Sequence, residues 1–297
     1  MVLTRLITPT AQAFWRLTKD YFMRYALHGM CSLHNNIVSD IRLAKETGYD
    51  GLEIHTEKLW RYINAGLTSQ DLKTRLNDAN IAPSAIDIIG SVESTTKEAQ
   101  NQLFRDTEIL CEFAKDIGAP TIQLNAFEAL TGLSVEDNIR ITAQNIRNIT
   151  DIGREHGIRF QYEGAAWTPI ATLDQYYQLH DAVNRDNFGF VLDTWHFWAC
   201  RGATPEDMAK IDKSLIYNVH LSDGHRPEVG APWVDEKELR NCLLGQGEIP
   251  LQEWTSAIQS TGYDGFYSGE FLNDQLWEGD HYETATSMLS GMKRLFS

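Results

Sequence analysis

The sequence has few cysteines, no long apolar run and few basic side chains for its length. Its four cysteines (Cys31, Cys111, Cys200 and Cys242) show no Cys-x-x-Cys spacing, so neither a disulfide framework nor a zinc clip is expected, and a reducing cytoplasmic location is predicted. No apolar run approaches the roughly 18 residues that a membrane-spanning helix needs, and no secretory signal pattern is evident. A membrane partner and export are therefore not expected.

Positive charge is also scarce. The 41 acidic side chains outnumber the 26 basic ones, which gives a formal net charge of −15. Such a field repels phosphate backbones, so nucleic acid is not expected as a partner and a small molecule is. Hydrophobic residues make up 42% of the chain, which is ample for a core. The 297 residues can form one large α/β domain.

Short apolar or β-branched runs alternate with longer amphipathic stretches eight times along the chain, which is typical of repeated strand–helix units and a parallel sheet. The runs cover residues 25–29, 51–55, 83–89, 121–127, 159–164, 188–196, 216–223 and 265–271. The pattern predicts an α/β protein whose eight parallel strands close into a (β/α)8 TIM barrel, a single domain over residues 23–297.

Helix start and stop signals separate these runs. Thr68 and Ser134 are predicted N-caps, and Gly118 and Gly157 are predicted to end helices. Residues 1–22 precede the first run and contain PTAQAFWRLTKDYF, which has a Thr-Pro start and apolar residues at helical spacing. This predicts an extra N-terminal helix; the alternative is an extension with no structural role.

Polar residues stand near the end of every predicted strand. In a parallel barrel all strands end at the same face, so these side chains converge there, whereas polar groups elsewhere on buried strands would be costly to desolvate. The residues, in chain order, are His28, Glu53 with His55, Asp87, Asn125, Glu163, Asp193 with His196, His220 with Asp223, and Glu270.

The last four strands supply a candidate metal site made of Glu163, Asp193, His220 and Glu270. Three carboxylates and an imidazole brought together would repel one another unless a cation lay among them. An oxygen-rich set with one imidazole predicts one divalent ion, first of all Mn²⁺, with Co²⁺, Mg²⁺ and Zn²⁺ as alternatives. The competing interpretation is that each residue is a helix cap or a satisfied buried polar group.

Several segments resemble a known family. FQYEG, NRDNFGFVLDTWHFWA, IYNVHLSDGHR, LGQGEIPL and GYDGFYSGEF look like pieces of the sugar-phosphate isomerase/epimerase-like barrels, the xylose isomerase-like (AP endonuclease family 2) superfamily that includes endonuclease IV. Within it, NRDNFGFVLDTWHF and GYDGLEI resemble the inosose (keto-inositol) isomerases most. The similarity covers about residues 25–297. It implies a TIM barrel and the same four metal ligands.

The resemblance also implies substrate contacts at His196, the histidine of a D-x-x-H motif, and at Arg226, six residues after the metal histidine. The sequence departs from members of this superfamily at two places. The chain reads EGAAWTP where ketose 3-epimerases continue with Pro and a polar Asn-Arg pair. The extra histidines and the D-x-H of the trinuclear zinc site of endonuclease IV are not evident, which favours one ion.

Other residues are weaker candidates. His28, His55 and Asn125 are candidates for hydrogen bonds to substrate hydroxyls, with satisfied buried polar groups as the alternative. Trp198 is a candidate for an apolar wall over a sugar ring, with plain packing as the alternative. Gly-Gln-Gly at 245–247 could wrap a phosphate, but a tight turn is the favoured interpretation.

A Lewis-acid ion flanked by glutamates fits proton abstraction next to a carbonyl. We therefore predict a metal-dependent isomerase or epimerase of a polyhydroxylated ketone, a keto-inositol or ketose, acting through a cis-enediolate with Glu163 and Glu270 as acid/base groups. A dehydratase or carbon–glycoside lyase would use the same enediolate and expel a β-substituent. An endonuclease IV-like phosphodiesterase is disfavoured by the −15 charge. A barrel that binds without turnover, and a homo-oligomer, stay open.

Overall fold

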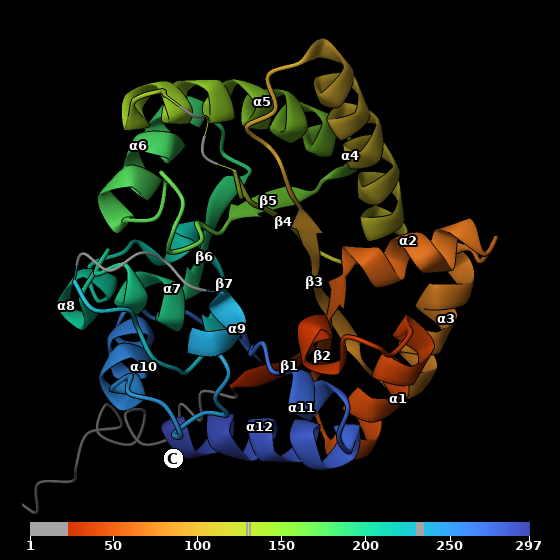
Figure 1. Ribbon diagram of the computed structural model, residues 1–297. Helices are drawn as coiled ribbons and strands as arrows, with labels where there is room; N and C mark the ends of the chain where they lie inside the picture. The colour runs from red at the N-terminus through yellow and green to blue at the C-terminus, as the bar shows by residue number, and fades with distance from the viewer. Residues whose placement is uncertain (1–22, 129, 131, 230–234) are drawn as a thin grey trace, which may run out of the picture.

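The computed structural model describes residues 23–297 except 129, 131 and 230–234. Its centre is a closed barrel with the strand order β1 to β8 (Figure 1). Every pair of neighbouring strands runs parallel, including β1 with β8. The predicted (β/α)8 TIM barrel is confirmed. The helix predicted within residues 1–22 lies outside the described residues.

All eight predicted runs form strands. Their bounds are β1 Arg24–His28, β2 Gly51–His55, β3 Ala82–Ile89, β4 Thr121–Leu124, β5 Arg159–Tyr162, β6 Phe188–Asp193, β7 Ile216–Leu221 and β8 Phe266–Gly269. Several strands end earlier than predicted, among them β6, whose predicted last residue His196 lies on a helix. The reason is local: the side chain of Asp193 accepts a hydrogen bond from the backbone N of His196 at 2.7 Å, which caps helix α7 immediately after the strand.

Helices surround the barrel. They are α1 Ile37–Thr47, α2 Thr56–Asn64, α3 Ser69–Ala79, α4 Lys97–Ile117, α5 Val135–His156, α6 Leu173–Val183, α7 Thr194–Ala199, α8 Pro205–Met208, α9 Glu236–Leu239, α10 Leu251–Ser260, α11 Asp274–Trp277 and α12 His281–Leu295. The predicted caps Thr68 and Ser134 are confirmed. Gly118 and Gly157 end α4 and α5 with φ of 85° and 73°, a left-handed conformation that glycine adopts without strain.

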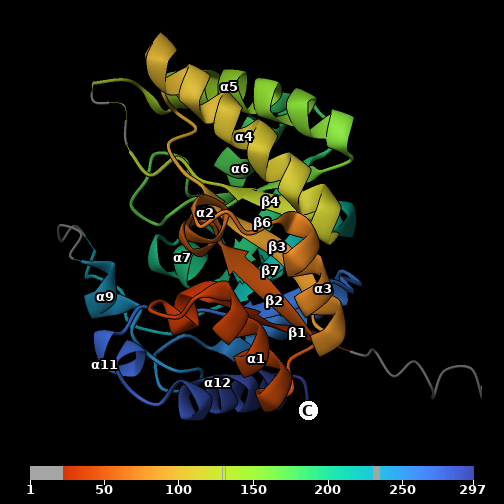
Figure 2. The same cartoon turned by 90° about the vertical axis from the view of Figure 1, so that its right-hand side faces the viewer.

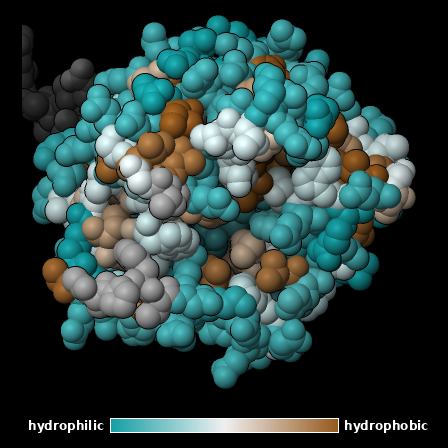
Figure 3. Space-filling view, turned by 45° about the horizontal axis from the view of Figure 1, so that its top comes forward, coloured by the Kyte–Doolittle hydropathy of each residue, from teal (hydrophilic) through white to brown (hydrophobic). Residues whose placement is uncertain are grey.

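The barrel has two unlike ends. The short helices α7, α9 and α11 lie at one end, and the C-terminus lies near the other (Figure 2). These helices follow β6, β7 and β8, so they line the end at which the strands finish. The face seen in Figure 3 is largely hydrophilic and is hollowed near its centre, with apolar residues beside the hollow. No helix among the described residues is long and apolar enough to cross a bilayer.

A buried ion pair fixes the segment that follows β1. Lys58 Nζ lies 2.7 Å from Asp40 Oδ2, with both side chains 1% exposed. The same ammonium donates to the carbonyl oxygens of Gly29 and Ser32, at 2.8 and 2.7 Å. Because these bonds satisfy both charges, the pair holds the turn directly after His28 in place.

Candidate active site

Four side chains from the last four strands converge at the mouth of the barrel. Asp193 ends β6 and His220 lies near the end of β7, while Glu163 and Glu270 follow β5 and β8 directly. The backbone N–H groups of Glu163 and Glu270 still bond to the neighbouring strands, at Leu124 O and Leu221 O. One donor atom from each of the four lies within 4.8 Å of the others, and all four residues are buried.

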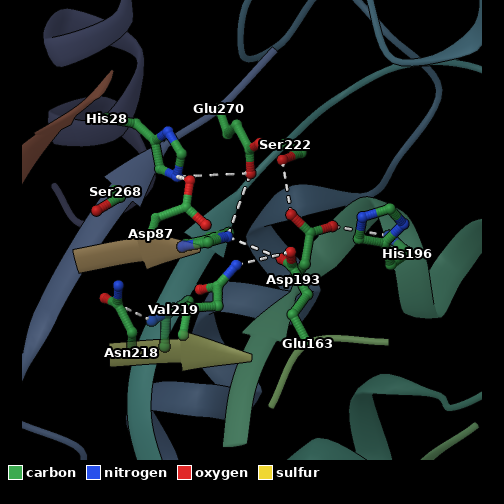
Figure 4. A network of polar contacts seen from close by, with 12 residues as sticks. His28, Asp87, Glu163, Asp193, His196, Asn218, Val219, Ser222, Ser268 and Glu270 are labelled. Carbon is green, nitrogen blue, oxygen red and sulfur yellow. Dashed lines mark hydrogen bonds and ion pairs between the residues drawn. The ribbon is translucent and has the colours of Figure 1, made fainter. Parts of the chain in front are cut away.

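The carboxylates are held by donors from other segments. Asp193 Oδ2 accepts from Ser222 Oγ at 2.9 Å, while its Oδ1 caps α7. Glu163 Oε2 accepts from Gln123 Nε2 at 3.0 Å, and Glu163 Oε1 lies 2.8 Å from His220 Nδ1. Glu163, Asp193 and Glu270 point toward one another, with His28 and Asp87 on one side and His196 on the other (Figure 4). Such contacts fix the direction in which each oxygen points.

Arg240 enters this cluster from just after α9, and the sequence analysis missed it. Its guanidinium is 2% exposed. Nη2 donates to Asp193 Oδ2 and Glu270 Oε2, each at 2.5 Å. Nη1 donates to Glu236 Oε1 at 2.9 Å and lies 3.3 Å from His196 Nε2. Arg240 ends no strand, so a search restricted to strand ends could not find it.

The two glutamates of the cluster differ electrostatically. Burial, which disfavours the ionised form, raises the pKa of Glu163 to about 7. Burial acts on Glu270 too, but the positive charges of Arg240 and His28 outweigh it and hold the pKa of Glu270 well below its usual value. Burial and the negative charges of Glu53 and Glu270 raise the pKa of Asp87 well above its usual value.

These residues fit a divalent cation. Among the described residues, Arg240 carries the one buried guanidinium, and it bonds to only two of the buried carboxylates, Asp193 and Glu270; Glu53, Asp87 and Glu163 are also buried. Besides burial, neighbouring carboxylates raise the pKa of Glu163 and Asp87, and a further cation would relieve that repulsion. Three carboxylates and one imidazole nitrogen also form a donor set that Mn²⁺, Co²⁺ and Zn²⁺ accept. Glu163, Asp193, His220 and Glu270 are the residues that could hold it.

Comparison with known families agrees with this architecture. Residues 41–293 match the xylose isomerase-like TIM barrel family. The chain belongs to this family. The membership predicted from the sequence is confirmed.

Known relatives include inosose isomerases. The inosose isomerase of Halalkalibacterium halodurans is 26% identical over 248 residues, which are 82% of this chain and 86% of the relative. That of Bacillus subtilis is 25% identical over 260 residues, 86% of this chain and 91% of the relative. The crystal structure of the IOLI protein with a zinc atom superposes with a TM-score of 0.84, at 22% identity, over 92% of this chain and 98% of that one.

Three of the predicted substrate residues of this xylose isomerase-like barrel carry polar atoms without a hydrogen-bond partner among the described residues. They are His28 Nε2, His55 Nδ1 and both side-chain polar atoms of Asn125. His28 Nε2 lies 3.7 Å from Asp87 and 3.9 Å from Glu53 and Glu270. Because buried polar groups are nearly always paired, these atoms are suited to bind ligand hydroxyls.

The other three predicted contacts lie on or beside α7. Burial lowers the pKa of His196 to about 4, and its Nδ1 accepts from the backbone N of Ala166 at 3.2 Å. Trp198 lies on α7. Arg226 is exposed and its guanidinium lies 4.4 Å over the Trp198 ring. The side chain of Arg226, which the family resemblance singled out, therefore stacks on an aromatic ring. Arg240 supplies the guanidinium beside the carboxylates.

The Gly-Gln-Gly segment forms a turn around a side chain of the barrel itself. The buried carboxylate of Asp223 accepts from the backbone N of Gly245, Gly247 and Ile249, at 2.8, 3.0 and 3.3 Å. It also accepts from Gly224 N at 2.9 Å. These donors are the groups that a phosphate would use, so the turn interpretation is the one that the geometry supports.

Asp223→Asn should lower the melting temperature, because an amide presents only one acceptor oxygen to four backbone donors and a charged-group bond contributes about 1.5–3 kcal/mol. Thermal denaturation followed by circular dichroism measures the change. Inorganic phosphate should leave the melting temperature of the wild-type protein unaltered. A phosphate-dependent rise that Asp223→Asn enhances would contradict the assignment of the turn.

Proposed function

We propose that the protein is a metal-dependent isomerase of a polyhydroxylated ketone, with a keto-inositol as the first substrate to test. The observation that carries the proposal is the buried convergence of Glu163, Asp193, His220 and Glu270 within 4.8 Å. The inosose isomerase relatives support an isomerase enzyme and a cyclitol substrate. Epimerisation of a ketose is the second candidate, because it begins with the same proton abstraction.

The metal identity is part of the proposal. Mn²⁺ is the ion that the oxygen-rich set favours, and Zn²⁺ is the ion named for the IOLI structure. Both potential metal-ligand groups found among the described residues contain His220 and Glu270. Because the groups share these residues, a single ion is better supported than a cluster of three ions. This, with the −15 charge, argues against an endonuclease IV-like phosphodiesterase.

A divalent ion at this site would polarise the carbonyl and neighbouring hydroxyl of a bound ketone and so acidify the α-proton. The protein's own residues would do the rest. One of Glu163 and Glu270 accepts the α-proton, which leaves a cis-enediolate. Return of that proton to the former carbonyl carbon, with transfer of the hydroxyl proton to the former carbonyl oxygen, moves the carbonyl by one carbon. Return to the opposite face of the original carbon would invert it instead.

Arg240 has a defined part in this scheme. Its guanidinium keeps Asp193 and Glu270 at a fixed separation, since Nη2 bonds to both. Its Nη1 lies beside His196, so the same side chain joins the ligand cluster to a proposed substrate contact. Arg226 and Trp198 would contact the substrate from the rim.

The decisive experiment is proton exchange in D₂O with a panel of inososes and ketoses. The wild-type protein should place deuterium at the α-position of its substrate, exhaustive chelation should abolish this, and Mn²⁺ or Zn²⁺ should restore it. His220→Ala should lose metal, as measured by elemental analysis, while His180→Ala on α6 serves as a histidine control. Full exchange after chelation would refute the metal requirement, and no exchange with any substrate would favour a binding protein.

Another prediction concerns the two glutamates proposed as proton acceptors. Glu163→Gln and Glu270→Gln each keep an oxygen donor and remove a base, so the chemical step should fall by a factor on the order of 10² to 10⁴ while part of the metal is retained. If only one variant loses exchange, carbonyl transfer is favoured, because one base on one face is sufficient. If each loses exchange from a different epimer, epimerisation is favoured. Undiminished exchange in both would place the base elsewhere, with His196 as the next candidate.

A further prediction distinguishes the roles of Arg240 and Arg226. Arg240→Gln should lower kcat on the order of tenfold or more, because the shorter, neutral amide removes the positive charge that Nη2 places between the two carboxylates. Arg226→Gln should raise KM and leave kcat and bound metal near wild type, because its guanidinium is exposed on Trp198. Steady-state kinetics with metal analysis of both variants measures the difference. Equal effects on kcat would show that the two side chains are misassigned.

A further inference from the structure

Glu53 is a buried carboxylate that the mechanism leaves unused. It lies in the middle of β2 and has no exposed surface. Its partners come from β7 and β8, across the inside of the barrel: Asn218 Nδ2 donates to Oε1 at 2.8 Å, and Ser268 Oγ donates to Oε2 at 2.5 Å. Removing a carboxylate from water is costly, so a carboxylate in this place needs a compensating role.

The third partner of Glu53 is His220. Its Nε2 lies 3.2 Å from Glu53 Oε1. The other ring nitrogen, Nδ1, lies 2.8 Å from Glu163 Oε1 and 3.2 Å from Glu270 Oε2. The two nitrogens therefore face different carboxylates: Nε2 faces Glu53 inside the barrel, and Nδ1 faces Glu163 and Glu270 at the mouth. Only Nδ1 points to the cluster that could hold the ion.

We infer that Glu53 is a positioning residue that accepts the Nε2–H of His220 and thereby presents the Nδ1 lone pair to the divalent ion. The inference rests on the proposed function for the existence of that ion. A carboxylate on the far nitrogen of a ligand histidine fixes both the tautomer and the ring orientation, and increases the basicity of the ligating nitrogen. Asn218 and Ser268 hold Glu53 in the orientation that this requires.

Another role for Glu53 would be to compensate the protonated form of His28, whose Nε2 lies 3.9 Å from Oε2. The two roles differ in geometry. The distance to His28 is too long for a hydrogen bond, whereas the distance to His220 is within range. Compensation of His28 would not alter how His220 binds a metal, so metal binding distinguishes the two roles.

The test compares Glu53→Gln with the wild-type protein as full chains. Glutamine fits the same space: its oxygen can accept from Asn218 and His220, and its amide can donate to Ser268 Oγ. Affinity for Co²⁺ and Zn²⁺ is measured by competition with a chromophoric chelator, and the visible absorption spectrum of bound Co²⁺ reports the ligand geometry. Because a neutral amide accepts more weakly and no longer increases the basicity of Nδ1, Glu53→Gln should weaken metal binding about 10- to 100-fold and change the Co²⁺ spectrum.

Two further variants make the result specific. Ser268→Ala removes one bond that orients Glu53 and should weaken metal binding about two- to fivefold; it decides the question if Glu53→Gln fails to fold. Asp40→Asn also alters a buried carboxylate, but one paired with Lys58, so it should lower the melting temperature and leave metal affinity unchanged.

The outcomes are separable. Wild-type affinity and an unchanged Co²⁺ spectrum in both Glu53→Gln and Ser268→Ala would overturn the inference, as would an equal loss of affinity in Asp40→Asn. If the wild-type protein binds neither Co²⁺ nor Zn²⁺, the proposed function itself fails, and that result is seen before any variant is compared.

Discussion

Repulsion among buried carboxylates is the constraint on which this barrel mouth depends. Glu163, Asp193 and Glu270 are brought together because parallel strands finish at one face, and burial leaves little water to screen their charges. Each oxygen must therefore be held by a donor that the chain supplies. Gln123 holds Glu163 and Ser222 holds Asp193, while Arg240 joins Asp193 to Glu270. The surrounding polar network follows from this requirement.

The network draws on segments that are far apart in the sequence. The turn around Asp223 anchors the long connection between β7 and α10 at both of its ends, because donors at Gly224 and at Gly245 to Ile249 meet on one carboxylate. Arg240 lies within that connection. On the other side of the mouth, Lys58 and Asp40 hold the turn after His28. Fixed segments thus lie on both sides of the mouth.

Much of this arrangement follows from the sequence by simple topology. Once eight strands alternate with helices, a polar residue at a strand end has one place to go, which is why Glu163, Asp193, His220 and Glu270 could be grouped without coordinates. The family resemblance added the predicted substrate contacts of His196 and Arg226. Strand limits were less accurate, because Asp193 ends β6 by capping α7, a local hydrogen bond that competes with the sheet.

Arg240 and the exposure of Arg226 could not be predicted in the same way. Both residues lie in the connection after β7, where neither strand alternation nor helical periodicity sets the direction of a side chain. Which arginine reaches the carboxylates is decided by the tertiary path of that connection, including the turn at Asp223. The role of Glu53 was also hidden, because its partners Asn218, His220 and Ser268 are distant in the sequence.

One consequence follows from the double use of Asp193. The same side chain faces the ligand cluster with one oxygen and caps the first turn of α7 with the other. A rotation of this carboxylate would therefore also disturb the cap of a helix that carries Trp195 and Trp198. The barrel mouth and this helix are therefore geometrically coupled, since neither can change its position without altering the same carboxylate.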